Sequence, residues 1–232
     1  MATAKKARKR TRRKGEGTGE HILETALGLF RDKGFDATTM RDVARAADMS
    51  LGAAYYYFPS KEAIVLSYYE QVVERRRAKA EGLFAETDDL RERIVGLYHL
   101  HFDAVSEDRK LLGALVRSVA DPDSPVSIFS SATRRVRNAT IDVFHRALDV
   151  DLVPDELRDL GALGFWTLDL GLMLYFVWDD SPGQRRTRAL VENAVDIVMP
   201  LVPLMTLPLA QPMVQHVART LIEAGLVPDD DD

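Results

Sequence analysis

Two very short helices with a tight turn between them, early in the chain, most constrain how this sequence can fold. Thr39 can cap the first helix, and Asp42 stands at its third position, as in a capping box. This helix is expected to end near Asp48, a residue type that tolerates turn geometry. Ser50 can cap the second helix, which Pro59 ends. Two short helices with a tight turn, supported by a third helix, predict a helix-turn-helix.

Helical periodicity continues on both sides of this motif. From Glu20, apolar residues recur at three- and four-residue steps until Gly34, a residue suited to the position just after a helix. Every strong pattern beyond residue 80 is also helical, and residues 20–80 show no alternation typical of a strand. We expect later helices at about 60–79, 88–106, 108–120, 125–149, 155–179, 183–206 and 210–225, with Pro200 and Pro203 kinking or ending the helix at 183–206. The predicted fold class is therefore all-α.

Charge is distributed unevenly along the 232 residues. Residues 1–61 contain 13 Lys and Arg against 7 Asp and Glu, whereas the remainder contains 18 against 29. A basic front joined to an acidic body suggests that only the front contacts a polyanion. We predict four parts: a disordered basic arm at 1–17, a helix-turn-helix domain at 18–77, a larger helical domain at 78–228 and an acidic tail at 229–232. The arm could lie along phosphates or act only as a solubilising tail.

Several classes of protein receive little support from the sequence. It has no cysteine, no Gly-x-Ser-x-Gly, no P-loop and no His-Glu-x-x-His motif. His99 and His101 are two positions apart and so face different sides of a helix, which is poor spacing for a metal site. We therefore expect no enzyme, no catalytic residues, no bound metal and no cofactor.

Membrane insertion is also not expected. The basic start of the chain is followed by no apolar segment of the kind found in secretion signals. The most apolar stretch, Gly161 to Trp178, carries Asp169 in its middle, and a carboxylate at the centre of a bilayer is costly. We read this stretch as a buried helix and expect a soluble, cytoplasmic protein.

The second short helix, with Ser50 at its start, is predicted to bind DNA, and it has the composition of a helix that approaches DNA closely. Small residues at Gly52, Ala53 and Ala54 let its backbone lie deep in a groove, and Leu51 stands at its start. The three tyrosines that follow point about 100° apart, so they cannot all be buried. Those facing outward can contact sugars, thymine methyls or phosphates, although packing between helices is the alternative, above all for the first tyrosine. The residues in question are Tyr55, Tyr56 and Tyr57.

Two helix starts beside the motif could hold DNA phosphates. Lys61 is expected in the first turn of the helix that follows, where the helix dipole disfavours a cation. A phosphate beside Lys61 would explain why a cation is tolerated there, and backbone N–H groups at the same helix start would bind that phosphate too. Thr39 offers an equivalent place at the first short helix.

The residues from Ile22 to Leu66 resemble the DNA-binding domain of the tetracycline-repressor (TetR) family of bacterial transcriptional regulators. The resemblance spans roughly residues 18–77. It rests on Ala26, Phe30, Gly34, Phe35, Thr39, Val43, Ala44, Ala47, Ser50, Gly52, Tyr55, Tyr57, Phe58, Ser60, Lys61 and Glu62.

This resemblance implies which residues meet DNA. Thr39, Tyr57 and Lys61 match phosphate-contacting positions, and the positions nearest the bases correspond to Leu51, Gly52, Ala53, Tyr55 and Tyr56. The sequence departs from the family pattern at Asp48, where the family often has Gly. It departs again at Ala53 and Ala54, where the family often has Thr and a large apolar residue. The second departure removes a hydroxyl that could read a base.

The resemblance also implies a C-terminal helical domain that dimerises through two helices and encloses a ligand cavity. Small residues on one face of the helix at 155–179, together with an apolar strip on the helix at 183–206, would form a four-helix interface with a second copy. The alternative is that these faces pack within one chain. The predicted interface residues are Gly164, Leu168, Gly171, Tyr175, Leu190, Ala194 and Ile197, and Gly161 falls on the same face.

Asp169 stands on the opposite, apolar face of the helix at 155–179. A carboxylate there is costly unless it is paired. It could contact a cationic or hydrogen-bonding effector, or it could pair with a protein Arg, His or backbone donor. The candidate ligand-binding residues are Phe102, Leu115, Phe129, Trp166, Asp169 and Met173.

The sequence therefore predicts a homodimeric regulator of transcription, most simply a repressor that an unknown small-molecule effector releases from a double-stranded DNA operator. Two other classes remain open. One is a DNA-binding structural protein that has no effector, which a filled C-terminal core would favour. The other is a membrane-surface protein that uses the basic arm, which binding to anionic vesicles would support.

Overall fold

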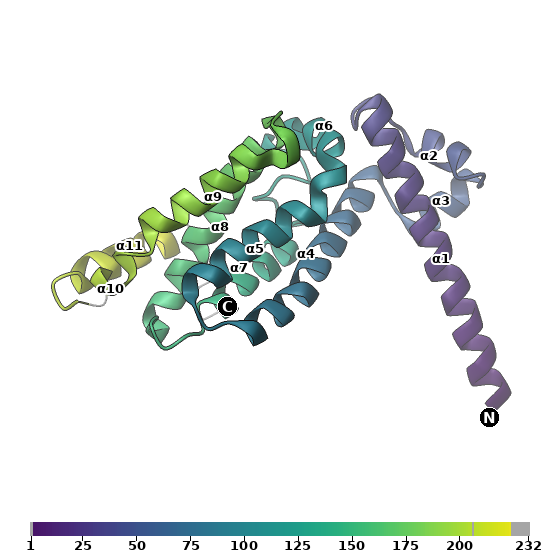
Figure 1. Cartoon of the computed structure of the whole chain (residues 1–232). Helices are drawn as coiled ribbons and strands as arrows, with labels where there is room; N and C mark the ends of the chain where they lie inside the picture. The colour runs from purple at the N-terminus through teal and green to yellow at the C-terminus, as the bar shows by residue number, and fades with distance from the viewer. Residues whose placement is uncertain (1, 206, 224–232) are drawn as a thin grey trace. The chain divides into compact units, whose positions relative to one another are not determined.

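A computed structural model describes the backbone of residues 2–205 and 207–223, and side chains from residue 17 onward except those at 218 and 222. Every regular element in these residues is a helix (Figure 1). The α-helices are α1 (Ala2–Lys33), α2 (Met40–Ala46), α3 (Leu51–Tyr57), α4 (Lys61–Glu86), α5 (Leu90–Val105), α6 (Arg109–Ala120), α7 (Arg134–Ala147), α8 (Asp155–Trp178), α9 (Arg185–Val198), α10 (Leu201–Met205) and α11 (Gln211–Glu223), with short 3-10 turns at Ser106–Asp108 and Pro182–Gln184.

The chain divides into two compact units. The first comprises residues 1–72 and 107–136, and the second comprises residues 73–106 and 137–232. The predicted domain boundary after residue 77 therefore differs from the structure, because α6 and the segment after it pack with the N-terminal helices. Asp108, just before α6, forms an ion pair with Arg31 of α1 and accepts a hydrogen bond from the Tyr68 hydroxyl at 2.9 Å.

The core of the first unit is formed by the apolar faces of α1, α2 and the start of α4. The rings of Phe30 and Phe35 meet edge to face, with their centroids 5.2 Å apart. Gly34, between them, has φ +88°, a left-handed conformation that ends α1 as predicted. The buried side chains here are Ile22, Leu23, Ala26, Leu27, Phe30, Phe35, Met40, Val43, Ala44, Ala47, Ala54, Ile64, Val65 and Tyr68.

In the second unit, α9 packs against both α5 and α8 (Figure 1). Phe102 of α5 stacks on Phe176 of α8, with ring centroids 4.8 Å apart. At the α8–α9 turn, the Asp179 carboxylate accepts hydrogen bonds from the backbone of Ser181 and from both the N–H and hydroxyl of Thr187. This network fixes how α8 leads into α9.

The structure differs from the predicted helix limits at four places, one of which is the end of α4, at Glu86 rather than near Lys79. Residues 1–17 were expected to be a disordered arm, but α1 begins at Ala2. Ala, Lys and Arg are strong helix formers, and the buried face of α1 supplies a helix that they can extend. The helix expected at 125–149 begins at Arg134, because Ser130 and Thr133 donate side-chain hydrogen bonds to the carbonyls of Pro125 and Ser127.

At the fourth place, the break predicted at two prolines occurs at Pro200 but not at Pro203, which lies inside α10. The helix expected at 183–206 is divided into α9, which ends at Val198, and α10, which starts at Leu201. Pro200 lies between them and has no backbone N–H to continue the helical ladder. The acidic tail predicted at 229–232 lies outside the described residues.

One helix, α8, is long and apolar enough to cross a membrane by length and mean hydropathy alone. Inside the second unit it packs against α5 and α9, and Asp169 near its middle is buried. A core helix in a folded protein meets the same criterion, so this property does not by itself indicate a membrane span.

Candidate functional site

The helix-turn-helix is held in shape by caps at the starts of both short helices. The Ser50 hydroxyl accepts a hydrogen bond from the N–H of Ala53 at 3.1 Å and so caps α3. Between α2 and α3, Asp48 has φ +53°, in the left-handed region. The turn after α2 thus depends on a residue that is not glycine but tolerates this conformation. Both features agree with the sequence predictions.

One face of α3 is exposed, and it is made of the predicted base-contacting residues. Ala54 is fully buried and attaches the helix to the core. Gly52, Tyr55 and Tyr56 are exposed, and they fall at relative positions 0, 3 and 4 along the helix, so they share one face. Leu51 and Ala53 are half-buried beside them.

The three tyrosines have different surroundings. Tyr56 is 84% exposed and Tyr55 is 48% exposed. Tyr57 is half-buried, and its ring lies 3.5 Å from where a Cβ at Gly19 of α1 would stand. The rings of Tyr56 and Tyr57 meet edge to face at 5.3 Å. Tyr56 is therefore presented outward while Tyr57 packs back onto the supporting helix.

Lys61 lies at the start of α4, as predicted, but its surroundings differ from the expectation. Its ammonium donates a hydrogen bond to the Phe35 carbonyl at 2.8 Å and stands 4.3 Å from the centroid of the Phe35 ring. A second carbonyl, that of Asp36, lies 3.4 Å away. These contacts hold a cation at this helix start without any phosphate, so the argument from the helix dipole no longer requires one.

Thr39 forms the predicted capping box with Asp42. Its hydroxyl accepts from the Asp42 N–H at 3.2 Å and donates to the Asp42 carboxylate at 2.7 Å, and the Thr39 N–H donates to the same carboxylate at 3.1 Å. These bonds, first of all the one from the Thr39 hydroxyl, hold the pKa of Asp42 below its usual value. Thr39 is exposed, so its position is open to a phosphate.

Two arginines of α2 were not among the predicted site residues. Arg41 and Arg45 are both exposed, four positions apart on one helix face. They border a surface depression of about 350 Å³, whose lining is Arg41, Ala44, Arg45, Asp48, Met49 and Leu51. In helix-turn-helix proteins the first helix crosses the DNA backbone. Two cations at that spacing on the first short helix were the signal that could have identified them.

In the second unit, Asp169 is paired with protein side chains. It is 2% exposed. One of its carboxylate oxygens lies 3.4 Å from Nη1 of Arg76 on α4, and the carboxylate lies 3.0 Å from Nδ1 of His101 on α5. Of the two alternatives left open by the sequence, the structure shows the internal pairing.

The Asp169 carboxylate is held in its charged form. Burial acts to raise its pKa, but the charges of His101 and Arg76 and the hydrogen bonds from both act in the opposite direction, and the net pKa lies below the usual value. Arg76 is also buried, and its guanidinium stands over the Phe144 ring at 4.7 Å. Neither partner of Asp169 was among the predicted site residues.

The other predicted ligand-binding residues lie in different places. Phe102 of α5 and Trp166 of α8 are buried in the second unit. Met173, also on α8, is half-buried. Leu115 and Phe129 belong to the first unit. Leu115 is buried there, whereas Phe129 is 60% exposed, so it is not a wall of a closed cavity in this structure.

The predicted interface residues all reach the surface of the second unit. Gly164, Gly171 and Tyr175 of α8 are exposed and Leu168 is half-buried, and on α9 Leu190 and Ile197 are exposed while Ala194 is half-buried. A Cβ added at Gly164 or Gly171 would have open space around it. Gly161 differs, because a Cβ there would stand 3.0 Å from Leu148 of the same chain.

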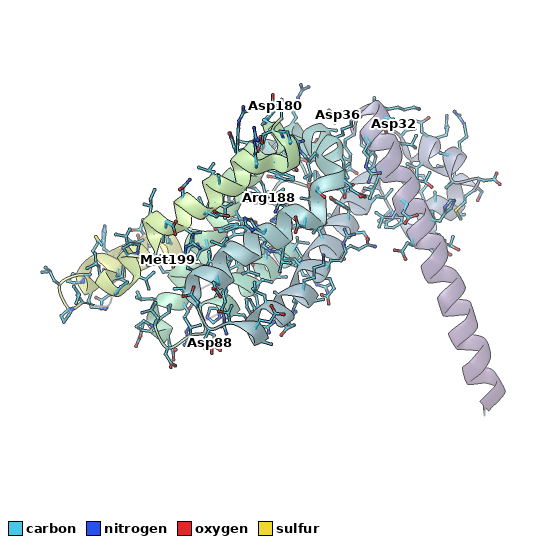
Figure 2. The ribbon with its side chains drawn as sticks, in the orientation of Figure 1. Asp32, Asp36, Asp88, Asp180, Arg188 and Met199 are labelled. Carbon is cyan, nitrogen blue, oxygen red and sulfur yellow. The ribbon has the colours of Figure 1, made fainter. Side chains whose placement is uncertain are left out.

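Ion pairs occupy a different side of α9. Arg188 of α9 pairs with Asp103 of α5 at 2.5 Å, and Asp196 of α9 pairs with Arg91 of α5 at 2.5 Å. Figure 2 marks Arg188 within α9, Asp180 at the turn before it and Met199 just after its end. These ion pairs and the buried Val191 and Val195 attach α9 to its own unit, while Leu190 and Ile197 remain exposed.

Comparison with known proteins finds two matching family descriptions. "Bacterial regulatory proteins, tetR family" matches residues 22–68. "Tetracyclin repressor-like, C-terminal domain" matches residues 93–217, which is more than half of the chain. The first match runs from within α1 to within α4 and the second from within α5 to within α11, so both units contribute to the likeness.

Individual proteins show the same likeness. The transcriptional repressor KstR2 of Mycobacterium tuberculosis is 28% identical over 151 residues, covering 60% of this chain and 74% of that protein. The regulator YuxN of Bacillus subtilis is 47% identical over 58 residues, which is 23% of this chain and only 20% of YuxN.

Solved structures share the fold at low sequence identity. A TetR-family regulator from Syntrophomonas wolfei has a TM-score of 0.66 at 18% identity, covering 83% of this chain and 98% of its own. A TetR regulator from Nitrosomonas europaea has a TM-score of 0.62 at 21% identity, covering 77% and 96%. Together with the two family matches and the exposed face of α3, these findings show that the chain belongs to the TetR family of helix-turn-helix transcriptional regulators.

Proposed function

We propose that this protein is a cytoplasmic repressor that binds a double-stranded operator as a homodimer and leaves it when a small molecule binds the second unit. The observation that carries the DNA-binding part is the exposed face of α3, where Tyr56 is 84% exposed next to Gly52 and Tyr55. A helix with small residues at its start and an outward aromatic can enter a major groove and meet base edges.

Phosphate contacts would come from the residues around that face. Arg41 and Arg45 supply exposed cations on α2, and Thr39 supplies a hydroxyl at the start of α2. Lys61 has three ammonium hydrogens, and the two carbonyls that it meets leave it able to reach a phosphate as well. Such contacts set affinity and register, whereas α3 sets sequence preference.

Dimerisation is supported by the apolar surface of α8 and α9. Five large apolar side chains are exposed there, namely Leu174, Tyr175, Trp178, Leu190 and Ile197. An exposed apolar patch on a folded domain commonly marks an interface. A two-fold dimer would present two α3 helices to half-sites about one DNA turn apart or somewhat more.

Release by an effector would act through populations of conformers. A ligand that binds better to one arrangement of the two α3 helices shifts the dimer toward it. If that arrangement no longer matches the half-site spacing, the operator is lost. The buried polar cluster around Asp169, within an otherwise apolar core, supports a place for such a ligand in the second unit.

The test begins with selection of bound sequences from a pool of random DNA duplexes by the full chain. We expect a two-fold symmetric motif to be enriched. Tyr56→Ala should then weaken binding to the selected duplex by about 10- to 100-fold, since a good base contact contributes about 1–3 kcal/mol of discrimination. Lys61→Ala should weaken binding to selected and unselected duplexes alike.

A matched control is Phe129→Ala, which removes another exposed aromatic ring outside the helix-turn-helix. It should leave affinity for the selected duplex unchanged. Thermal unfolding of each variant separates loss of contact from loss of fold. Failure to enrich any sequence, or equal affinity of wild type and Tyr56→Ala, would contradict the proposal.

A further inference from the structure

Arg76 has an unsatisfied edge buried in the second unit. Its side chain is one of the largest fully buried ones, with the residue 1% exposed. Nη1 faces Asp169 at 3.4 Å and His101 at 3.5 Å. Nε and Nη2 are buried and have no hydrogen-bond partner within the part of the chain that the structure describes.

The two unpartnered nitrogens lie on the same side of the guanidinium. In arginine, the hydrogens of Nε and Nη2 point in parallel from one edge of the planar group. That edge is the fork that binds a carboxylate through two parallel hydrogen bonds. The two nitrogens without partners thus form one complete binding edge of Arg76, rather than being on different sides of the guanidinium.

The rest of the guanidinium is already engaged. Its face lies over the Phe144 ring at 4.7 Å, and its opposite corner meets the Asp169 carboxylate, which His101 holds from the other side at 3.0 Å. An aromatic ring can stabilise the face of a cation but accepts nothing from the edge. A buried donor without an acceptor lowers the stability of the folded protein, so nearly all buried donors in native proteins have a hydrogen-bond partner.

The aromatic ring against the face of Arg76 belongs to a larger buried cluster of aromatic side chains. Tyr98 lies with its ring 5.4 Å from that of Phe144, and its hydroxyl already donates to the Phe165 carbonyl at 2.8 Å. Phe144 and Phe165 are themselves stacked, at 6.2 Å. A molecule that bonded Arg76 would therefore lie next to a buried aromatic cluster, which favours an apolar body behind its polar group.

We propose that the Nε–Nη2 edge of Arg76 binds the carboxylate of an otherwise apolar effector. This inference rests on the proposed function and names the chemical class of its ligand. Asp169 and His101 hold the guanidinium by its other corner, so Asp169 does not itself require a cationic ligand. The fork offers two donors, which match the two oxygens of a carboxylate. Because Asp169 already balances the charge of Arg76, a singly charged carboxylate fits better than a doubly charged phosphate monoester.

The test uses probes that differ only in their head group. Octanoate and 1-octanol form one pair, and 4-phenylbutyrate and 4-phenylbutan-1-ol form an aromatic pair. Binding to the full chain is measured by titration calorimetry and by the shift in Tm, without DNA. We expect at least one carboxylate to bind roughly tenfold or more tightly than its alcohol, as for a charge-assisted fork in a dry site.

Two variants locate the effect. Arg76→Lys keeps the cation but removes the fork, so the preference for carboxylate over alcohol should fall to about twofold or less. The matched control is Arg93→Lys. Arg93 is another buried arginine, but its Nε, Nη1 and Nη2 bond the carbonyls of Thr87, Asp149 and Phe84, so carboxylate preference should persist.

If Arg76→Lys does not fold, the wild-type protein still decides the matter. In ¹⁵N-labelled protein, the Nε–H resonance that octanoate or phenylbutyrate shifts should belong to a buried, slowly exchanging arginine, and 1-octanol should not shift it. Equal affinity for carboxylate and alcohol in both pairs, or no carboxylate binding up to roughly 10 mM, would overturn the inference.

The inference and the proposed function fail in different ways. If neutral compounds release the protein from the selected duplex and carboxylates do not, the proposed effector-controlled repression is supported and the proposed role of Arg76 is contradicted. If carboxylates bind with the expected preference but never change DNA binding, carboxylate binding by Arg76 is supported and the proposed release by an effector is wrong.

Discussion

At the scale of single residues, the buried arginines show how an interior cation can be held in two ways. Arg93 donates to three backbone carbonyls and to Asp88, so each side of its guanidinium has an acceptor. Arg76 has one carboxylate, one imidazole and one aromatic ring, and an open edge. The first arrangement suits a structural clamp, and the second leaves room for a further acceptor.

Replacing Asp169 by Asn should destabilise the second unit strongly. The change leaves the buried Arg76 cation without its counter-charge, a loss of about 3–5 kcal/mol in comparable pairs. The control Asp88→Asn should cost less than about 1 kcal/mol, because Asp88 is exposed and Arg93 keeps its three carbonyls. Urea unfolding at neutral pH measures both, and equal effects would contradict the assignment of Asp169 as the necessary counter-charge.

The same carboxylate should make stability depend on acidic pH. The pKa of Asp169 is lowered in the folded protein, so the unfolded chain binds its proton first as pH falls. The stabilisation is complete above the ordinary carboxyl pKa of about 3.9 and is lost as pH falls through the folded value. The difference in unfolding free energy between wild type and Asp169→Asn should therefore shrink on acidification below about pH 4, and a constant difference would exclude this origin.

The left-handed backbone conformation of Asp48 lowers the stability of the protein, and a substitution can remove this effect. Its φ of +53° is disfavoured for a residue with a Cβ, though less for Asp than for most. Asp48→Gly should stabilise the protein by up to about 1 kcal/mol, whereas Asp48→Val should destabilise it. Asp48→Asn keeps the tolerance for this conformation while removing the charge, so it should stay close to wild type. A lower Tm for Asp48→Gly would show that the backbone conformation is not the source of the cost.

At the scale of elements, different faces of α9 make different contacts. Val191 and Val195 are buried in the core, the pairs Arg188–Asp103 and Arg91–Asp196 attach α9 to α5, and Leu190 and Ile197 remain exposed. Leu190, Ala194 and Ile197 recur at steps of four and three, which places them on one stripe. A stripe that its own chain leaves uncovered is what a two-fold partner would bury.

Charged substitutions on this stripe should separate the proposed dimer. The double variant Leu190→Asp, Ile197→Asp would bury two carboxylates per chain in the interface, and such burial without partners is costly. Light scattering coupled to gel filtration should give about the chain mass of 26.0 kDa for the variant and about twice that for wild type. Asn138→Asp, at an exposed position of α7, should remain dimeric. A wild-type protein of one chain mass would contradict the proposed interface.

At the scale of the whole molecule, the uneven charge should make DNA binding depend steeply on salt. The basic part of the chain contains the helix-turn-helix, while the remainder is acidic. Each phosphate neutralised contributes about 0.9 to the slope of log affinity against log salt. The net charge of −5 would otherwise oppose approach to DNA, so binding must rely on locally placed cations.

Arg45→Ala should reduce that slope by about 1 for every protein chain bound, hence by about 2 for a dimer on its operator. The Arg45 side chain is exposed, and its ion pair with Asp42 is long, at 3.9 Å, so the fold should be unaffected. Lys79→Ala, an exposed cation of α4 in the second unit, should leave the slope unchanged. An unchanged slope for Arg45→Ala would remove α2 from the proposed DNA contacts.

Features set by chemistry within a few residues were predictable from the sequence. The capping box of Thr39 and Asp42, the Ser50 cap, the left-handed Gly34 and the break at Pro200 each depend on groups only a few positions apart. Local backbone preferences and hydrogen bonds decide such features before any tertiary contact forms. The same kind of reasoning, aided by the family resemblance, led to α3 and its tyrosines.

Other local patterns misled because competing local bonds were not weighed. Periodicity alone favoured a helix from residue 125, but Ser130 and Thr133 bond nearby carbonyls and delay it to Arg134. Phe129, expected to line a cavity as an apolar side chain, is 60% exposed in the segment before that helix. Composition indicates that a residue is apolar, but not whether the segment carrying it reaches a core.

By itself, the sequence determined an all-helical chain with capped short helices and an outward α3, because those depend on near neighbours and on the helical period. Only the tertiary structure decided that Asp169 meets Arg76, 93 positions away, and that Lys61 bonds the Phe35 carbonyl, 26 positions away. It alone also placed α6 with the N-terminal helices. The partner of a buried charge is set by which helix faces pack together, and packing sums many weak contacts that no short stretch of sequence contains.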